Sequence, residues 1–197
     1  MELSLRKLQH IAGLALKNGI RLHFDSIKLY KLKSYSTALF ISVIAMEEIG
    51  KAFGADHFVF HSRIDGRVDS DFENEWINLL LGDHKGKQMS FLRQIFSKVD
   101  RKYLDYVNSK QLDKLKQDSI YVGLEKPSKG NPRTDGKIIN PSKHDKKKTK
   151  EQILLIQNFL ESEIEDIEKG IIYHDLASFR KTLNIDLLVK LKFERIK

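Results

Sequence analysis

The chain has 197 residues, of which 41% are hydrophobic, and a formal net charge of +8. This length favours one domain over residues 1–197, and the hydrophobic content is sufficient for a core. The absence of cysteine excludes disulfides, thiolate metal sites and cysteine nucleophiles. No signal-peptide pattern opens the chain, and the apolar stretch Ala38–Ile49 is too short to span a bilayer. We therefore expect a soluble cytoplasmic protein without membrane contact.

Apolar residues at helical spacing predict a first long helix over residues 3–32 and a second over 35–61, joined by a short corner. The second helix is apolar nearly all round, so we expect it to be buried on more than one side. A third helical element begins near Asp71, is interrupted at residues 82–87 and then resumes. A short helix is expected at 111–116.

Residues 123–150 contain all three prolines and few apolar residues, which predicts a long mobile loop within the domain. From residue 126 onward this segment has nine lysines and arginines against two aspartates, nearly the whole positive excess of the chain. Such local basicity indicates one contact zone, which could bind an RNA backbone. The alternative is a solvated lysine run that binds no ligand. The candidate RNA-binding residues are Lys126, Lys129, Arg133, Lys143, Lys146, Lys147 and Lys148.

A last long helix is expected over about 150–169, with Thr149 as a candidate N-cap. A tail in two short pieces around Asn184 follows, and strand signals are nearly absent. These patterns predict an all-α fold: an antiparallel up-and-down bundle of four to five long helices, with the basic loop before the last of them.

Two adjacent carboxylates and a lysine interrupt the apolar second helix. Glu47 and Lys51 are four residues apart, the spacing of a surface ion pair. Glu48 shares a stripe with Ala45 and Ala52, so we expect it to point inward, where a carboxylate needs a partner. This group is either a structural salt bridge or part of a site.

Lys51 and His57 could act together on a phosphodiester, the cation stabilising charge and the imidazole transferring a proton. Six residues apart in a straight helix, they lie on opposed sides, so this requires the helix to bend or end at Gly54.

The sequence DHKGK (Asp83–Lys87) lies at the predicted interruption of the third element. Here His84 could serve as general acid or base, with Lys85 or Lys87 on a phosphate. An ordinary connector with solvated charges is the alternative. No H-E-x-x-H or P-loop pattern occurs, and we expect neither a metal nor a cofactor.

The chain resembles the AbiV family of phage abortive-infection proteins, which belongs to the HEPN superfamily of helical domains. The resemblance spans roughly residues 5–170. It rests on three stretches, YSTALFISVIAMEEIGKAF (Tyr35–Phe53), DHKGK (Asp83–Lys87) and SIYVG (Ser119–Gly123).

This resemblance implies a HEPN-like bundle that forms a homodimer with two copies of a site at the interface. It also implies growth arrest on infection, through blocked translation, and a phage-encoded activator. Many HEPN proteins are metal-independent ribonucleases with an Arg-x(4–6)-His motif; this chain lacks the motif, and Lys51-x(5)-His57 is the nearest substitute. Two functions remain open: RNA cleavage, or non-catalytic binding of RNA, the ribosome or the activator. Carried over by position, the catalytic candidates are Glu48, Lys51, His84 and Lys87, followed by Glu47, His57 and Lys85.

Overall fold

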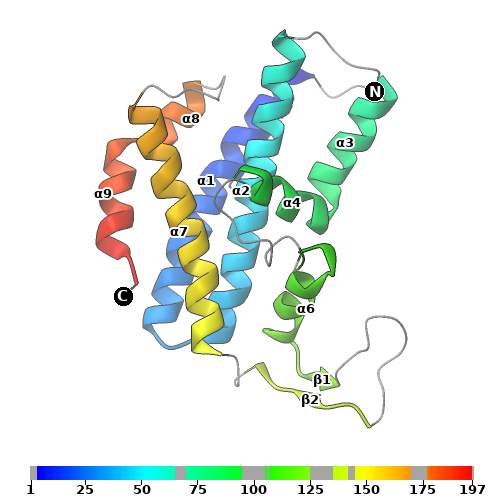
Figure 1. The fold of residues 1–197 in the computed structure, drawn as a ribbon, viewed down its shortest axis with the longest axis vertical. Coiled ribbons are helices and arrows are strands. Elements are labelled where there is room, and N and C mark those ends of the chain that lie inside the picture. Colours follow the sequence, from blue (N-terminus) through cyan, green and yellow to red (C-terminus); the bar gives the residue numbers. More distant parts are fainter. Residues whose placement is uncertain are drawn as a thin grey trace.

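Three long helices form the body of the protein in a computed structural model (Figure 1). They are α1 (Leu5–Lys31), α2 (Tyr35–Ile64) and α7 (Lys146–Glu168), with 27, 30 and 23 residues. α1 runs antiparallel to both α2 and α7, and it packs most extensively against α2. This arrangement confirms the all-α prediction. The structure describes residues 4–64, 70–94, 105, 107–124, 135–141, 145–169 and 177–196.

Shorter elements surround this body. α3 and α4 pack on one side of α2, while α9 packs against α7 (Figure 1). Two short strands pair antiparallel, with Gly123 opposite Ile139. The bounds are α3 (Ser70–Gly82), α4 (His84–Gln94), α6 (Gln111–Asp118), β1 (Gly123–Leu124), β2 (Ile138–Ile139), α8 (Ala177–Thr182) and α9 (Ile185–Glu194).

The core lies where α2 meets α4 and α7. Aromatic rings meet there edge to face, with centroid distances of 5.0 Å for Phe53 and Phe159 and 4.8 Å for Phe91 and Phe159. All three rings are buried. As expected from its apolar character all round, α2 is buried against neighbours on several sides.

A glycine on α2 allows α4 to approach closely. A Cβ atom at Gly50 would collide with the carbonyl oxygen of Lys87 and would lie 2.9 Å from the backbone nitrogen of Phe91. Both are backbone atoms of α4, so no side-chain rotation could relieve the overlap. Gly50 thus fixes the spacing between α2 and the helix that begins at His84.

The last long helix begins earlier than the sequence suggests. Asp145 is its N-cap, and its Oδ1 accepts a hydrogen bond of 2.7 Å from the backbone N–H of Lys147. Thr149 is inside the helix instead, where its hydroxyl donates to the carbonyl oxygen of Tyr35 at 3.2 Å. The segment predicted as a loop therefore contributes β1, β2 and the first turn of α7. Residues 125–134 and 142–144 lie outside the described residues.

The C-terminal helix is attached through a buried polar chain. The His23 ring on α1 contacts Gln157 Oε1 at 3.0 Å, and Gln157 Nε2 donates to the carbonyl oxygen of Leu191 on α9 at 2.7 Å. Asn184 caps α9 by accepting from the N–H of Leu187, as the predicted break at Asn184 requires. Among the helices that the structure describes, none is long and apolar enough to cross a membrane.

Candidate functional site

Glu47 is a buried carboxylate in the middle of α2, with 4% of its side chain exposed. Its Oε2 lies 2.8 Å from His84 Nδ1. Its Oε1 accepts hydrogen bonds of 2.8 Å from both Gln88 Nε2 and Lys116 Nζ. A buried carboxylate is stable only when its charge is compensated and its lone pairs are used, and these three partners meet both requirements.

Three helices supply these groups. Glu47 comes from α2, and Lys116, with 9% of its side chain exposed, comes from α6. His84 and Gln88 are one turn apart on α4 and so share a face. Asp113 completes the group, since its Oδ1 accepts from Gln88 Nε2 at 2.9 Å and lies 3.6 Å from Lys116 Nζ. We call these five residues the Glu47 cluster.

The interruption at DHKGK places His84 at the start of α4. Asp83 separates α3 from α4, and its Oδ2 accepts a hydrogen bond of 2.9 Å from the N–H of Gly86. This side chain satisfies one of the free N–H groups of the first helical turn. The interruption predicted from the sequence is therefore a capped helix start, and it turns the histidine toward α2.

The contact with Glu47 favours the tautomer of His84 in which Nε2 can accept a proton. When Glu47 is ionised it can only accept, so Nδ1 of His84 carries the proton and donates it. The other nitrogen, Nε2, then holds a free lone pair on a side chain that is 54% exposed. A carboxylate that fixes the tautomer and stabilises the imidazolium is the arrangement found in histidine bases of many enzymes.

Glu48 and Lys51 face a different neighbour. Lys51 Nζ lies 2.5 Å from Glu48 Oε1, and Asn18 Nδ2 on α1 donates to Glu48 Oε2 at 3.2 Å. The sequence led us to pair Glu47 with Lys51 and to point Glu48 inward; the structure shows Glu47 buried and Glu48 half-buried in the ion pair. Consecutive helical residues are rotated by about 100°, so only one of the two carboxylates can face α4 and α6.

Lys51 and His57 are not brought together. Their joint action required the helix to bend or end at Gly54, but α2 continues as one helix through Gly54 to Ile64. Lys51 pairs with Glu48, and the exposed His57 ring packs on His61 with a centroid distance of 4.3 Å.

Two lysines of DHKGK flank the exposed histidine. Lys85 and Lys87 are half-buried on α4, and among the described residues neither side chain has an ion-pair partner. Both therefore remain candidates for contact with a phosphate near His84.

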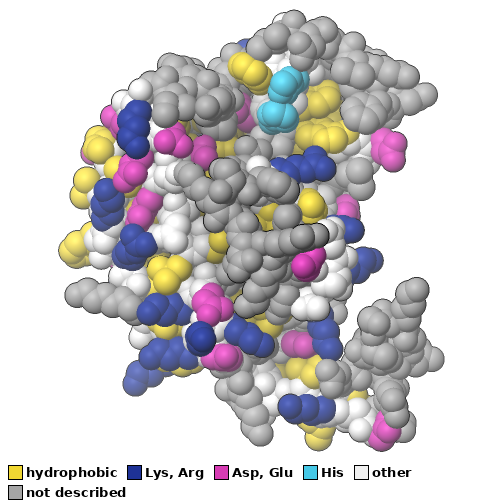
Figure 2. Space-filling model, viewed as in Figure 1, with side chains coloured by type: hydrophobic (Ala, Val, Ile, Leu, Met, Phe, Trp, Pro, Cys, Tyr) yellow, Lys and Arg dark blue, Asp and Glu magenta, His cyan; other side chains and the backbone are white. Residues whose placement is uncertain are grey.

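The basic residues of the predicted loop divide into two groups. Lys146, Lys147 and Lys148 lie exposed in the first turn of α7 and have no ion pair with any described residue. Figure 2 shows many of the Lys and Arg side chains of this face in its lower half, around the start of α7. The other predicted RNA-binding residues, Lys126, Lys129, Arg133 and Lys143, lie outside the described residues.

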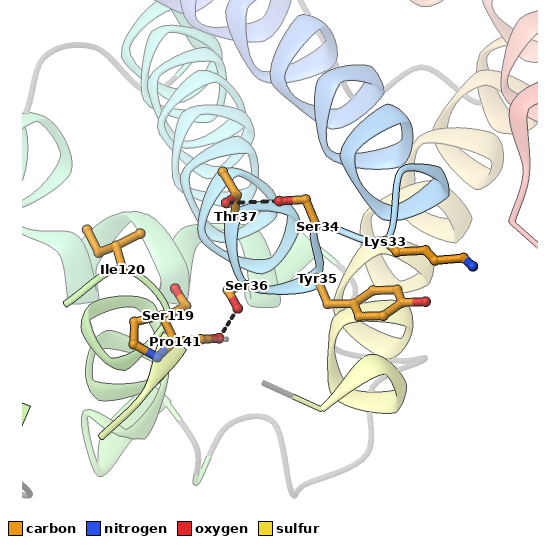
Figure 3. A pocket seen from close by; sticks show the side chains of 8 residues that line it. All are labelled: Lys33, Ser34, Tyr35, Ser36, Thr37, Ser119, Ile120 and Pro141. Atoms are coloured by element: carbon orange, nitrogen blue, oxygen red, sulfur yellow. Dashed lines mark hydrogen bonds between the residues drawn. The ribbon is translucent and has the colours of Figure 1, made fainter. Parts of the chain in front are cut away.

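A pocket of about 450 Å³ opens beside this basic end, between the α1–α2 corner and the end of α6 (Figure 3). Its walls are rich in hydroxyl groups; Ser36 Oγ donates to the carbonyl oxygen of Pro141, and Ser34 Oγ donates to Thr37 Oγ1 at 3.2 Å. Lys33 also lines the pocket, but its side chain points away from Ser36 and Pro141 (Figure 3). The lining residues are Lys33, Ser34, Tyr35, Ser36, Thr37, Ser119, Ile120 and Pro141.

The pocket and the Glu47 cluster share two helices. Ser36 and Glu47 are eleven residues apart on α2, which is about three turns and roughly 16 Å along one face. On α6, Lys116 reaches Glu47 while Ser119, one turn later, lines the pocket.

Sequence reasoning missed Gln88, Asp113 and Lys116. A signal for Lys116 existed, because it follows the buried Leu112 by four residues and so lies on the apolar face of its short helix. Nothing in one sequence pairs that lysine with Glu47. Within the described part of the chain, no group of three or more His, Asp or Glu side chains could hold a metal ion.

The comparison with known families agrees with this structure. The family model for AbiV, a HEPN domain, matches residues 7–161, which include α2, the Glu47 cluster and most of α1 and α7. No curated protein and no solved structure shows a significant match. A match over most of the chain, together with the helical bundle, shows that the protein belongs to the AbiV family of abortive-infection phage-defence proteins.

Proposed function

We propose that this defence protein arrests growth on infection by shutting down translation through RNA cleavage, with His84 as the general base. The observation that carries the proposal is the Nδ1 contact of 2.8 Å between His84 and the buried Glu47. It leaves Nε2 of a half-exposed imidazole available to take a proton.

The chemistry that fits is attack by an RNA 2′-hydroxyl on the adjacent phosphate. His84 Nε2 takes the hydroxyl proton as the 2′-O–P bond forms, and the P–O5′ bond breaks. The 5′-oxygen is protonated by the imidazolium or by water, which leaves a 2′,3′-cyclic phosphate. The nucleophile belongs to the RNA itself, so the step needs no metal-bound water. In this proposal Lys85 and Lys87 neutralise the phosphate charge.

Glu47 acts through His84 and does not touch the RNA. It holds the tautomer that presents Nε2 and stabilises the imidazolium once the proton has moved. Lys116 and Gln88 occupy the other oxygen of the carboxylate, so that Oε2 is left to the histidine. They are positioning residues in this scheme.

The test is cleavage of total cellular RNA by the purified protein, in EDTA, with and without lysate from phage-infected cells. We expect wild type to cleave, His84→Ala to lose at least 100-fold and Glu47→Gln to lose an intermediate amount. His61→Ala is the matched control, since it removes another exposed histidine of the described chain. Full cleavage by His84→Ala, with its melting temperature unchanged, would refute the assignment.

A second candidate function is non-catalytic binding of RNA or the ribosome through the basic end. The exposed lysines 146–148 and the nearby hydroxyl-lined pocket favour it. If it holds, Lys146→Glu, Lys147→Glu and Lys148→Glu together abolish translation arrest, while His84→Ala leaves arrest intact and RNA stays whole. The opposite pattern supports the catalytic proposal, and the phage-encoded activator would be the component that the infected lysate supplies.

A further inference from the structure

α9 exposes an apolar stripe to its surroundings. Ile185, Val189 and Phe193 follow one another at intervals of four residues, so they lie along one side of the helix. Their exposed fractions are 52%, 63% and 85%, and hydrophobic side chains reach the left edge of Figure 2, where α9 lies. Leu191, on the opposite side of α9, and Leu188, on one flank of the stripe, are buried in the bundle. A continuous exposed apolar stripe of this kind marks an interaction surface.

The orientation of α9 is fixed by polar contacts on both flanks. Lys190 Nζ lies 4.3 Å from the centroid of the Phe24 ring on α1, and Lys192 Nζ lies 3.4 Å from Glu165 Oε1 on α7. Glu194 forms an ion pair with Lys31 of α1. A rotation that buried the stripe would break these contacts and expose Leu191. The stripe therefore faces outward because the fold places it there.

The pattern of α9 is complementary to a second copy of itself. We propose that two chains associate through an antiparallel pairing of their α9 helices around Val189. In that arrangement Val189 meets its own copy, and Ile185 lies opposite Phe193 of the second copy, so all six exposed apolar side chains are covered.

Charges on one flank support this choice of partner. Asp186 and Lys190 lie roughly 60° and 100° round the helix from Val189, on the same side. In an antiparallel pair the same flank of both helices lies on the same side of the interface. Asp186 of each copy therefore lies beside Lys190 of the other, which gives two symmetric pairs. Asp186 has no ion-pair partner among the described residues of its own chain. Opposite charges in this register favour antiparallel pairing over a parallel one.

This interface is separate from the proposed RNA site. α9 lies on the far side of α7 and α2 from α4 and α6 (Figure 1), and it follows the last residue matched by the family model. The proposal therefore stands or falls independently of RNA cleavage. It also differs from a homodimer that joins two copies of the site at the interface.

Cysteine cross-linking tests the register, because the chain has no cysteine of its own. Under mild oxidation Val189→Cys should form a disulfide-linked dimer, since only a residue at the symmetry centre meets itself within disulfide distance. Ile185→Cys alone should stay monomeric on a denaturing gel, but a mixture of Ile185→Cys and Phe193→Cys should cross-link. Leu14→Cys, an exposed apolar position on α1, is the matched control.

Sedimentation of charge variants tests the partner. Asp186→Lys or Lys190→Asp should weaken self-association at least tenfold, and the two together should restore it, with melting temperatures confirming that each variant is folded. Val189→Glu should leave a monomer. The proposal is overturned if wild type stays monomeric up to roughly 1 mM chain. It is also overturned by a dimer that tolerates Val189→Glu and does not cross-link at position 189, because such a dimer uses another face.

Discussion

Replacing Lys116 by methionine tests whether the Glu47 cluster is buried and ionised. Methionine keeps the length of the side chain but removes the ammonium group, which lies 2.8 Å from Glu47 Oε1 and 3.6 Å from Asp113 Oδ1. Glu47 would then keep its contacts with Gln88 and His84 but lose its only fixed cation among the described residues. Breaking a buried ion pair by removing one partner costs about 3–5 kcal/mol.

The low end of that range applies here, because two hydrogen bonds to the carboxylate survive. We expect Lys116→Met to lower the free energy of unfolding by about 3 kcal/mol. For a chain of this size that corresponds to a melting temperature lower by roughly 6–12 °C. Equilibrium unfolding in urea, followed by circular dichroism, measures the difference.

The double variant separates the ion pair from simple packing. Glu47→Gln also breaks the pair, but Lys116→Met combined with Glu47→Gln leaves no unpaired charge between the two positions, so its loss should be smaller than the sum by about 1–3 kcal/mol. Gln117→Met, at an exposed position of the same helix, should change stability by less than about 0.5 kcal/mol. A Lys116→Met protein as stable as wild type would refute the reasoning, since it would place the ammonium group in solvent.

Two further predictions concern the bundle around the site. Burial lowers the pKa of His23 from 6.5 to about 4 against a smaller opposing effect of its bond to Gln157, so the unfolded chain binds a proton between these pH values and the folded chain does not. The free energy of unfolding should therefore keep its full value above pH 6.5 and fall by roughly 3 kcal/mol as the pH drops toward 4. His23→Gln should reduce this pH dependence, measured by urea unfolding at a series of pH values. Gly50→Ala should lower the free energy of unfolding by about 1–3 kcal/mol and reduce RNA cleavage, because its methyl group would push α4 and His84 away from Glu47. The control Ala52→Gly, on the same helix, should lower the free energy of unfolding by about 1 kcal/mol or more without moving α4. Equal RNA cleavage by the two variants would contradict this role for Gly50.

Much of the fold could be predicted because its helices obey local rules. The start of α4 after Asp83 and the start of α9 after Asn184 both follow from side chains that accept a hydrogen bond from a backbone N–H nearby. The start of α7 was misplaced by four residues. Three lysines in a first turn oppose the helix dipole, so the pattern hid the helix that Asp145 starts.

The candidate site was only half visible, for a physical reason. In a helix that is apolar all round, periodicity does not tell which side faces which neighbour, so nothing local distinguishes Glu47 from Glu48. The distinction depends on where α4 and α6 pack, and Lys116 is 69 residues from Glu47 in the chain. His84 could be predicted as a candidate because it stands at an interruption, where polar side chains are exposed to ligands.

The two proposals together predict that variants of α9 and of the Glu47 cluster affect different properties of the protein. The α9 stripe and the Glu47 cluster lie on different sides of the bundle, and no residue belongs to both (Figure 1). Val189→Glu should therefore abolish self-association while the monomer cleaves RNA at the rate of wild type, and His84→Ala should do the reverse. If Val189→Glu also abolished cleavage in a folded protein, the second copy would have to complete the RNA site, and α9 could not be a separate interface. Measuring both properties on both variants thus decides whether association and RNA chemistry are independent in this fold.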